Sequence, residues 1–165
     1  MKLAFLDLFE VEGGAVRGAA LVTDERTRPL EFRLTDPVRM SSIERKLCGS
    51  VANEHLAGDL CGGPLLDALR ETPDCVLVRD ESLVSLQDRR RAPVLWIGPG
   101  ETVHNEDGEV VAAGPMIGFD GDSQLLSDAK AALGRIARSY DLLEPFERMM
   151  EAVEEVVREG LAQPN

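Results

Sequence analysis

A charged residue interrupts the first apolar run of the chain. Asp7 lies in the middle of residues 3–9, a run that predicts a buried strand, and burying an unpartnered carboxylate is costly. A second apolar run, residues 75–78, leads into Asp80 and Glu81. If the two strands are neighbours, their acids supply the oxygen ligands that hard cations such as Mg²⁺ prefer. They are therefore the first candidates for a metal site.

Asp7 also has a purely structural interpretation. At a strand edge its carboxylate would accept hydrogen bonds from backbone amides, or it would pair with Arg17 across the first hairpin. Charged groups that are hydrogen-bonded in this way stabilise a sheet modestly. We favour this structural role over a catalytic one.

The cysteines, histidines and glycine-rich segments form no recognised catalytic or nucleotide-binding motif. Cys48, His55 and Cys61 carry zinc-ligand atoms, but their spacing does not return all three to one helix face and no fourth ligand is evident. Residues 61–64 and 98–100 lack the lysine and hydroxyl of a phosphate-binding loop. Cysteines without a C-x-x-C pair predict reduced, buried thiols and a cytoplasmic protein.

The start of the chain predicts an antiparallel meander of three strands. Residues 3–11 and 16–23 are strand-like on either side of a glycine turn, and a third alternating strand opens at Pro29. A helical region follows, capped by Ser41 or Ser42. Its glycines are expected to divide it into two pieces, with a break at Gly58 or Gly62-Gly63 before Pro64 starts a shorter helix.

The rest of the chain predicts parallel strands and a pair of helices. Continuous apolar runs at residues 75–78 and 94–97 are typical of strands covered on both faces, with a short helix at residues 81–87 between them. A peripheral hairpin is expected around Asp107. The helical pair occupies about residues 123–160, and its last helix carries an apolar stripe.

These elements predict an α/β fold in a single domain over residues 1–165. The expected sheet is mixed, with the antiparallel meander and the parallel inner strands in one platform, and helices packed on it in two or three layers. No stretch has the length of apolar sequence that crosses a bilayer or forms a secretory signal.

The charge of the chain disfavours acidic partners. Its formal net charge of −12 repels phosphate backbones at long range. Against this, Arg89-Arg90-Arg91 together with Arg26, Arg28 and Arg33 would form a local basic patch. We favour a solvated loop for the arginine run, so nucleic acid is a disfavoured partner.

The order strand, strand, strand, helix, strand, helix, strand over residues 3–97 resembles the ribonuclease H-like fold. The resemblance is one of layout and includes no specific motif. It implies metal-binding acids at Asp7, Glu44 and Asp80, with Asp128 as a fourth, that hold Mg²⁺ or Mn²⁺ for phosphodiester cleavage. No small or hydroxyl residue follows Asp7 as in common members of the family.

Two hypotheses for function follow. The favoured one is a small cytoplasmic module without catalysis and without a cofactor, which acts in interaction or regulation. Its C-terminal helix, rich in Phe, Met and Val, would bind a protein partner or a second copy. The alternative is a metal-dependent nuclease or phosphoryl-transfer enzyme of ribonuclease H-like type.

Overall fold

The chain begins with a long antiparallel hairpin. β1 (Leu3–Val11) pairs with β2 (Ala15–Thr23) along its whole length, and the short turn η1 (Glu12–Gly14) connects them. Gly13 and Gly14 have φ angles of 75° and 71°, a region that residues with a Cβ atom rarely adopt. The hairpin predicted from the sequence is confirmed.

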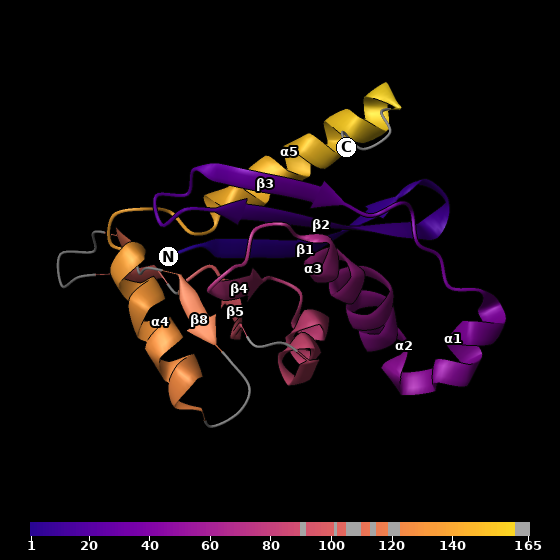
Figure 1. Cartoon of the computed structure of the whole chain (residues 1–165), viewed down its shortest axis with the longest axis horizontal. Helices are drawn as coiled ribbons and strands as arrows, with labels where there is room; N and C mark the ends of the chain where they lie inside the picture. The colour runs from indigo at the N-terminus through magenta and orange to yellow at the C-terminus, as the bar shows by residue number, and fades with distance from the viewer. Residues whose placement is uncertain (90–91, 101, 105–109, 113–114, 119–122, 161–165) are drawn as a thin grey trace.

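One mixed sheet contains six of the strands. β3 (Pro29–Leu34) pairs antiparallel with β2, while β4 (Cys75–Val78) and β5 (Val94–Gly98) run parallel to β1 on its other side. The strand β8 (Met116–Gly118), which the sequence did not predict, pairs antiparallel with β5. The order is β3-β2-β1-β4-β5-β8 (Figure 1), so the predicted α/β fold with a shared platform is confirmed.

The computed structural model describes residues 1–89, 92–100, 102–104, 110–112, 115–118 and 123–160. A small separate hairpin pairs β6 (Thr102–His104) with β7 (Val110–Ala112). This agrees with the predicted peripheral hairpin, although its turn at Asp107 lies outside the described residues, as do the side chains of the predicted arginine run at 89–91.

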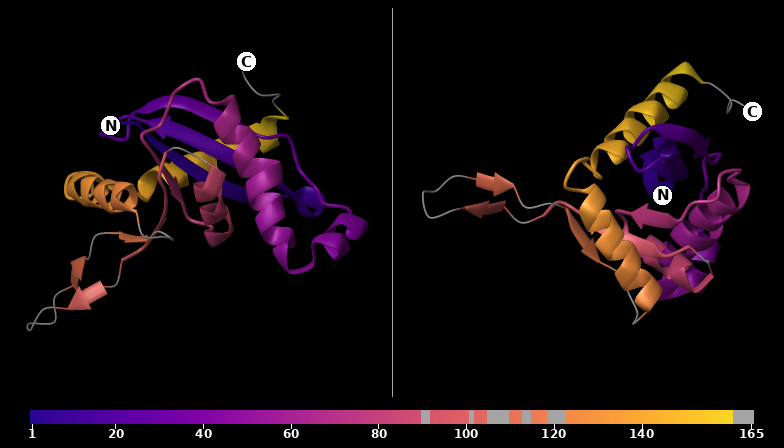
Figure 2. Two further views of the ribbon diagram at one scale, coloured as in Figure 1. Left: turned by 60° about the horizontal axis from the view of Figure 1, so that its bottom comes forward. Right: turned by 60° about the vertical axis from the view of Figure 1, so that its left-hand side comes forward.

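Helices cover both faces of the sheet. α4 (Gln124–Ile136) and α5 (Glu144–Glu159) enclose a core with the odd-numbered residues of β1, such as Leu3 and Phe5. The helical segments of residues 55–68 and the 3₁₀ segment η4 (Glu81–Arg89) enclose a second core with the even-numbered ones. Figures 1 and 2 show α5 and α3 on opposite sides of the strands.

The helical region differs from the prediction in where it breaks. Its segments are α1 (Ser42–Cys48), η2 (Gly49–Val51), α2 (Ala52–Glu54), the π-helical η3 (His55–Gly62) and α3 (Gly63–Ala68). The expected break at Gly58 or Gly62-Gly63 is wrong, because the helix continues through them and instead turns at Gly49, where φ is 56°.

Close packing explains why a glycine is needed inside this helix, at position 62. A Cβ atom added at Gly62 would lie 2.9 Å from Cδ2 of Leu83 and 3.0 Å from the carbonyl oxygen of Ala57. The helix can therefore approach η4 only because this position has no side chain. At Gly62 the requirement for space outweighs the low helix propensity of glycine.

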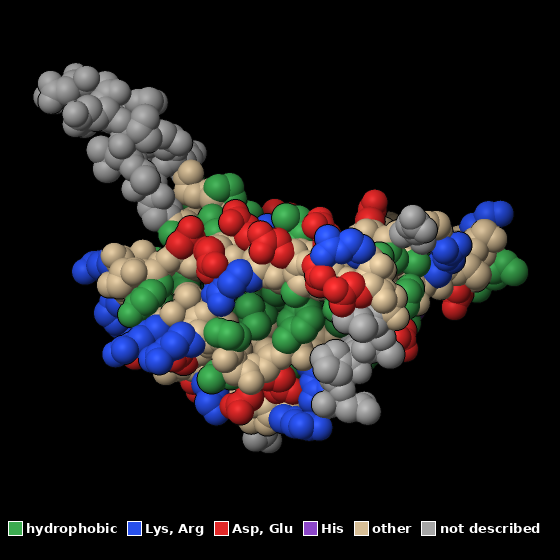
Figure 3. Space-filling view, turned by 90° about the horizontal axis from the view of Figure 1, so that it is seen from above, with side chains coloured by type: hydrophobic (Ala, Val, Ile, Leu, Met, Phe, Trp, Pro, Cys, Tyr) green, Lys and Arg blue, Asp and Glu red, His purple; other side chains and the backbone are tan. Residues whose placement is uncertain are grey.

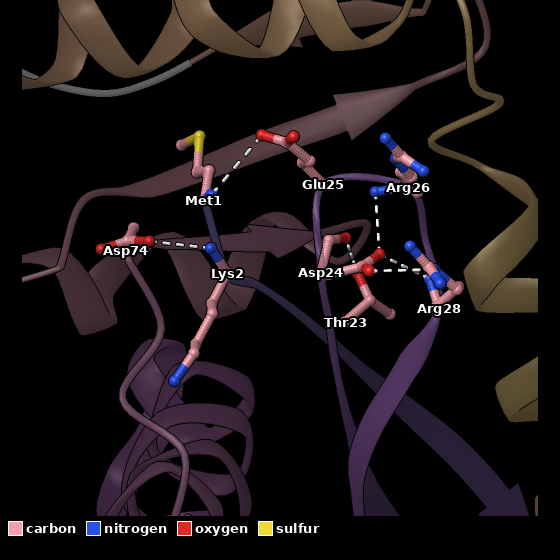
Figure 4. Close-up of polar contacts among 8 residues, drawn as sticks. All are labelled: Met1, Lys2, Thr23, Asp24, Glu25, Arg26, Arg28 and Asp74. Carbon is pink, nitrogen blue, oxygen red and sulfur yellow. Dashed lines mark hydrogen bonds and ion pairs between the residues drawn. The ribbon is translucent and has the colours of Figure 1, made fainter.

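Polar contacts at the amino end of β1 hold the sheet together there (Figure 4). The Oδ2 atom of Asp74 accepts a hydrogen bond from the backbone amide of Lys2 at 2.7 Å, just before β4. The Oδ1 atom of Asp24 accepts from the amides of Arg26 and Arg28 at 2.9 and 3.0 Å and shapes the turn into β3. Asp7 lies in the middle of β1, one residue beyond the last β1–β4 pair, Leu6 opposite Val78.

Two glycine substitutions should therefore have opposite effects on stability. Gly62→Ala should lower the free energy of unfolding by about 1 to 2 kcal/mol through overpacking. Gly134→Ala is the matched control in α4, where an added Cβ meets nothing described within 4 Å, and should raise it by up to about 1 kcal/mol. Urea unfolding measures both, and a stabilising Gly62→Ala would contradict the packing described above.

Candidate functional site

Asp7 is almost fully buried on the α5 face of β1, with 5% of its surface exposed. Arg79, which directly follows β4, donates to its Oδ2 atom from Nε at 2.8 Å and also from Nη2. The expected partner Arg17 lies opposite Phe9 and donates instead to the carbonyl oxygen of Thr35. Asp7 is thus paired across the sheet with a residue 72 positions away.

The second carboxylate oxygen of Asp7 accepts a hydrogen bond from the backbone of β1, close to where β4 ends. β1 pairs with β4 only as far as Leu6, which lies opposite Val78. The amide of Leu8 lies beyond that last pair and donates to Oδ1 of Asp7 at 3.0 Å. The predicted backbone hydrogen bond to Asp7 is therefore present, and both carboxylate oxygens are engaged by donors, as expected of a structural ion pair.

Arg79 connects Asp7 with three further elements. Its guanidinium lies over the ring of Phe146 in α5, 4.8 Å from the ring centroid. Its carbonyl oxygen accepts a hydrogen bond from Nε1 of Trp96 in β5 at 3.0 Å. Phe146 in turn meets Phe5 of β1 edge to face, with ring centroids 5.3 Å apart. The ion pair therefore joins β1, β4, β5 and α5.

Burial dominates the titration of Asp7. Removal from water raises the pKa of Asp7 above its ordinary value of 3.8, and the hydrogen bonds and charge of Arg79 offset this only in part. The nearby charge of Asp80 raises the pKa further. Arg79 thus reduces the cost of a buried acid without abolishing it.

Asp80 follows Arg79 but belongs to the opposite face of the sheet. Its Oδ1 atom accepts hydrogen bonds from the amide and hydroxyl of Ser82 at 2.9 and 2.6 Å, where η4 begins. It borders a cavity of about 330 Å³ lined by Leu8, Glu10, Val16, Asn53, Leu56, Asp80 and Ser82. Asp80 lies just after the end of β4, as predicted, whereas Asp7 lies in the middle of β1, and the two side chains contact different layers.

Glu44 and Asp128 make contacts within their own helices. Glu44 accepts from the amide of Ser41 at 2.7 Å, and the hydroxyl of Ser41 accepts from the amide of Glu44 at 3.2 Å, which forms a capping box. Asp128 accepts from the side chain of Gln124 at 2.8 Å. Among the residues described, no group of three or more Asp, Glu, His or Cys side chains is placed to hold a metal ion. A site for Mg²⁺ or Mn²⁺ stays a prediction.

The cysteines are free thiols in different surroundings. Burial raises the pKa of Cys61 to about 11 and that of Cys75 to about 12, so both are protonated at neutral pH and weakly reactive. Cys48 and His55 border a cavity of about 250 Å³ that Cys61 does not line, so the three zinc-type residues are not brought to one cavity. His55 pairs instead with Asp59, Nδ1 to Oδ2 at 2.6 Å.

An apolar groove lies between the carboxyl end of β1 and the last turns of α5. This α5 groove has a volume of about 520 Å³ and is lined by Leu8, Phe9, Glu10, Val11, Met150, Val153, Glu154, Val157 and Arg158. Met150 and Val157 are each 43% exposed. Figure 3 views the molecule from the α5 side and shows hydrophobic side chains gathered in the middle of that face.

Sequence reasoning identified the acid and missed its partner. Asp7 stands out in the sequence because a charge in an apolar strand needs a compensating group. The available signal for Arg79 was its place directly after the predicted strand at residues 75–78; that this strand runs parallel to β1 and ends beside Asp7 is given by the structure. The sequence indicated the α5 groove more weakly. Its only sign was that the apolar stripe of the last helix is wider than a single core-facing side requires.

Comparisons with known proteins assign no family to the chain. No protein-family model matches it, and no curated protein matches its sequence. Within the described residues, every helix is too short or too polar to cross a bilayer. A functional interpretation therefore depends on the contacts and surfaces given above.

Loss of Arg79 should destabilise the fold measurably. Arg79→Ala leaves a buried carboxylate without its cation, a change that costs about 3 to 5 kcal/mol for fully buried pairs. Because 39% of the Arg79 side chain is exposed, we expect a loss of about 2 kcal/mol in the free energy of unfolding. The control Arg28→Ala removes an exposed pair with Asp24 and should cost less than about 1 kcal/mol. If both variants lost the same free energy of unfolding, the buried pair would stabilise the fold no more than the exposed pair does.

The raised pKa of Asp7 predicts the direction of a pH effect. A raised folded-state pKa means that protonation favours the folded state, so this contribution is complete below 3.8, the value in the unfolded chain, and is lost as the pH rises through the folded-state pKa. Wild type should therefore gain stability relative to Asp7→Asn as the pH falls from neutral toward that value. Urea unfolding across this range checks the sign, and a relative loss on acidification would mean that Arg79 outweighs burial.

Proposed function

We propose that this protein is a non-catalytic interaction module of the cytoplasm and that the α5 groove is its docking surface for an apolar segment of a protein partner. The observation that carries this proposal is the position of Met150 and Val157. Both side chains belong to a helix that is firmly packed on the sheet, yet both remain open beside an apolar groove. A cavity of this size falls in the range of ligand-binding clefts.

Two adjacent stripes of α5 have different roles. Phe146, Met149 and Val153 are 0%, 1% and 3% exposed and complete the core. Met150 and Val157 lie beside that stripe and extend the apolar surface toward Phe9 of β1. Grooves of this kind bind amphipathic helices through a few apolar anchors, and methionine adapts its shape to different partners.

The contacts of the acids support a module without catalysis. Asp7 is engaged by Arg79 and the amide of Leu8, and Glu44 by Ser41. A carboxylate that serves as a metal ligand or general base needs an oxygen directed at its ligand or substrate. The metal-dependent nuclease alternative therefore has less support, although the described order of strands and helices remains compatible with the ribonuclease H-like layout that we propose for the fold.

The buried thiols support a reducing environment. Cys61 and Cys75 are free, and both are inside the core and not on a reactive surface. Core cysteines that remain thiols are usual in cytoplasmic proteins. The proposed cytoplasmic location is consistent with this usage.

Photo-crosslinking at the groove tests the proposed function. A photoreactive phenylalanine analogue at position 150 should form covalent adducts with protein partners in cells. The same analogue at Leu125, an exposed apolar residue of α4, is the matched control and should form few. Val157→Glu should reduce the adducts at position 150, because a charge in the groove opposes apolar docking.

The outcome is decisive only if the variants remain folded. Deletion of residues 145–165 is unsuitable, since it removes the core side chains Phe146 and Met149 and would unfold the protein in any case. Urea unfolding should show that the substituted proteins retain wild-type stability within about 1 kcal/mol. Absence of adducts at position 150, or equal adducts at position 125, would contradict the docking role of the groove.

A further inference from the structure

α1 carries an apolar stripe that its own chain leaves uncovered. Ile43 and Leu47 are four residues apart on α1, a spacing typical of a buried helix face, and Val51 extends this apolar set beyond the turn at Gly49. They are instead 68%, 82% and 53% exposed, and none of the seven residues of α1 is buried. Exposed apolar side chains in a contiguous set mark interaction sites. We call residues 42–51, which contain this stripe, the α1 arm.

The position of the arm gives it access to other molecules. Figure 1 shows α1 at the far end of the helical region, away from the strands. The turn at Gly49, with φ of 56°, separates α1 from the helical segments that follow. Figure 3 shows hydrophobic and basic side chains at this end of the molecule. The arm is therefore a projecting element whose apolar side faces solvent.

The charges of the arm and of α5 are opposite. Arg45 and Lys46 are exposed on the arm, and Glu44 is the one acid among its residues. These three charges sum to +1 within a chain of net charge −12. α5 contains six glutamates and two arginines, a sum of −4. Glu10, Glu154 and Arg158 line the α5 groove itself, a sum of −1.

We propose that the α1 arm of one copy docks into the α5 groove of a second copy. This inference rests on the proposed function, because it names the occupant of the same groove. The apolar stripe of the arm would contact Met150 and Val157, while Arg45 and Lys46 would approach Glu154 and the neighbouring acids of α5. Apolar contact would hold the arm, and the charges would select its orientation.

A second copy is a suitable partner because the arm is apolar and basic, whereas the groove is apolar and acidic. An apolar patch and a complementary groove at different places on one molecule form a heterologous contact, which closes when two copies exchange arms or continues as a chain when they do not. The net charge of each copy opposes association at long range. Physiological salt screens that repulsion beyond about 8 Å but screens contacts between partly buried charges much less.

Analytical ultracentrifugation of the full-length protein tests this inference. Wild type, studied from micromolar to millimolar concentration in physiological salt, should show concentration-dependent self-association. Leu47→Glu in the arm and Val157→Glu in the groove should each weaken it more than about tenfold, because each buries a charge in the contact. Leu125→Glu, on the exposed side of α4, should leave it unchanged.

Mixing the two defective variants distinguishes a heterologous contact from any other. Leu47→Glu keeps an intact groove and Val157→Glu keeps an intact arm, so an equimolar mixture should form heterodimers that neither variant forms alone. Self-association that either variant leaves intact, or a mixture that stays monomeric, would overturn the inference. Urea unfolding of each variant confirms that it is folded.

The same data separate this inference from the proposed function. A wild-type protein that stays monomeric throughout would overturn docking of a second copy. Adducts between position 150 and other proteins would then still support the groove as a docking surface. Absence of both self-association and adducts would reject the two proposals together.

Discussion

The ion pair between Asp7 and Arg79 is the contact on which the arrangement of the layers depends. It joins the central strand β1 to the end of β4, and Arg79 extends it to Trp96 of β5 and Phe146 of α5. α5 is thereby fixed beside Phe5. Its later turns then lie along the end of β1, where they form the α5 groove. A buried charge in the first strand thus contributes to the position of the groove between β1 and the last turns of α5.

The structure separates the acids that the sequence suggested as one site. Odd-numbered residues of β1 contact the α5 layer and even-numbered ones contact the helical region, so neighbouring strand ends do not bring all acids to one face. Asp7 lies in one layer and Asp80 borders the cavity of the other. The ion pair of Asp7 with Arg79 joins elements of the fold, and the surfaces that we propose for docking are apolar: the groove beside Met150 and the exposed side chains around Leu47.

Local patterns predicted most of the fold, whereas contacts between distant segments determined the rest. Alternation and glycine turns indicated β1, β2 and β3, and continuous apolar runs indicated the parallel strands. β8 was missed because three residues carry too little periodicity. Gly62 was misinterpreted because its close approach to Leu83 is a tertiary constraint. Asp7 was recognised as a problem, but its partner depended on the register between β1 and β4. The helical spacing of Ile43 and Leu47 indicated burial, yet the chain supplies no covering element among the described residues.

The coupling free energy between Asp7 and Arg79 is the most direct test of this organisation. A double-mutant cycle with Asp7→Asn, Arg79→Ala and the double variant isolates it, with urea unfolding at neutral pH as the measurement. If the pair joins β1 to β4 and α5, Arg79→Ala should lower the free energy of unfolding much less in the Asp7→Asn background than in wild type. The expected coupling is at least about 1 kcal/mol. Additive losses, with coupling close to zero, would show that the two side chains stabilise the fold independently and would contradict the central role of their ion pair.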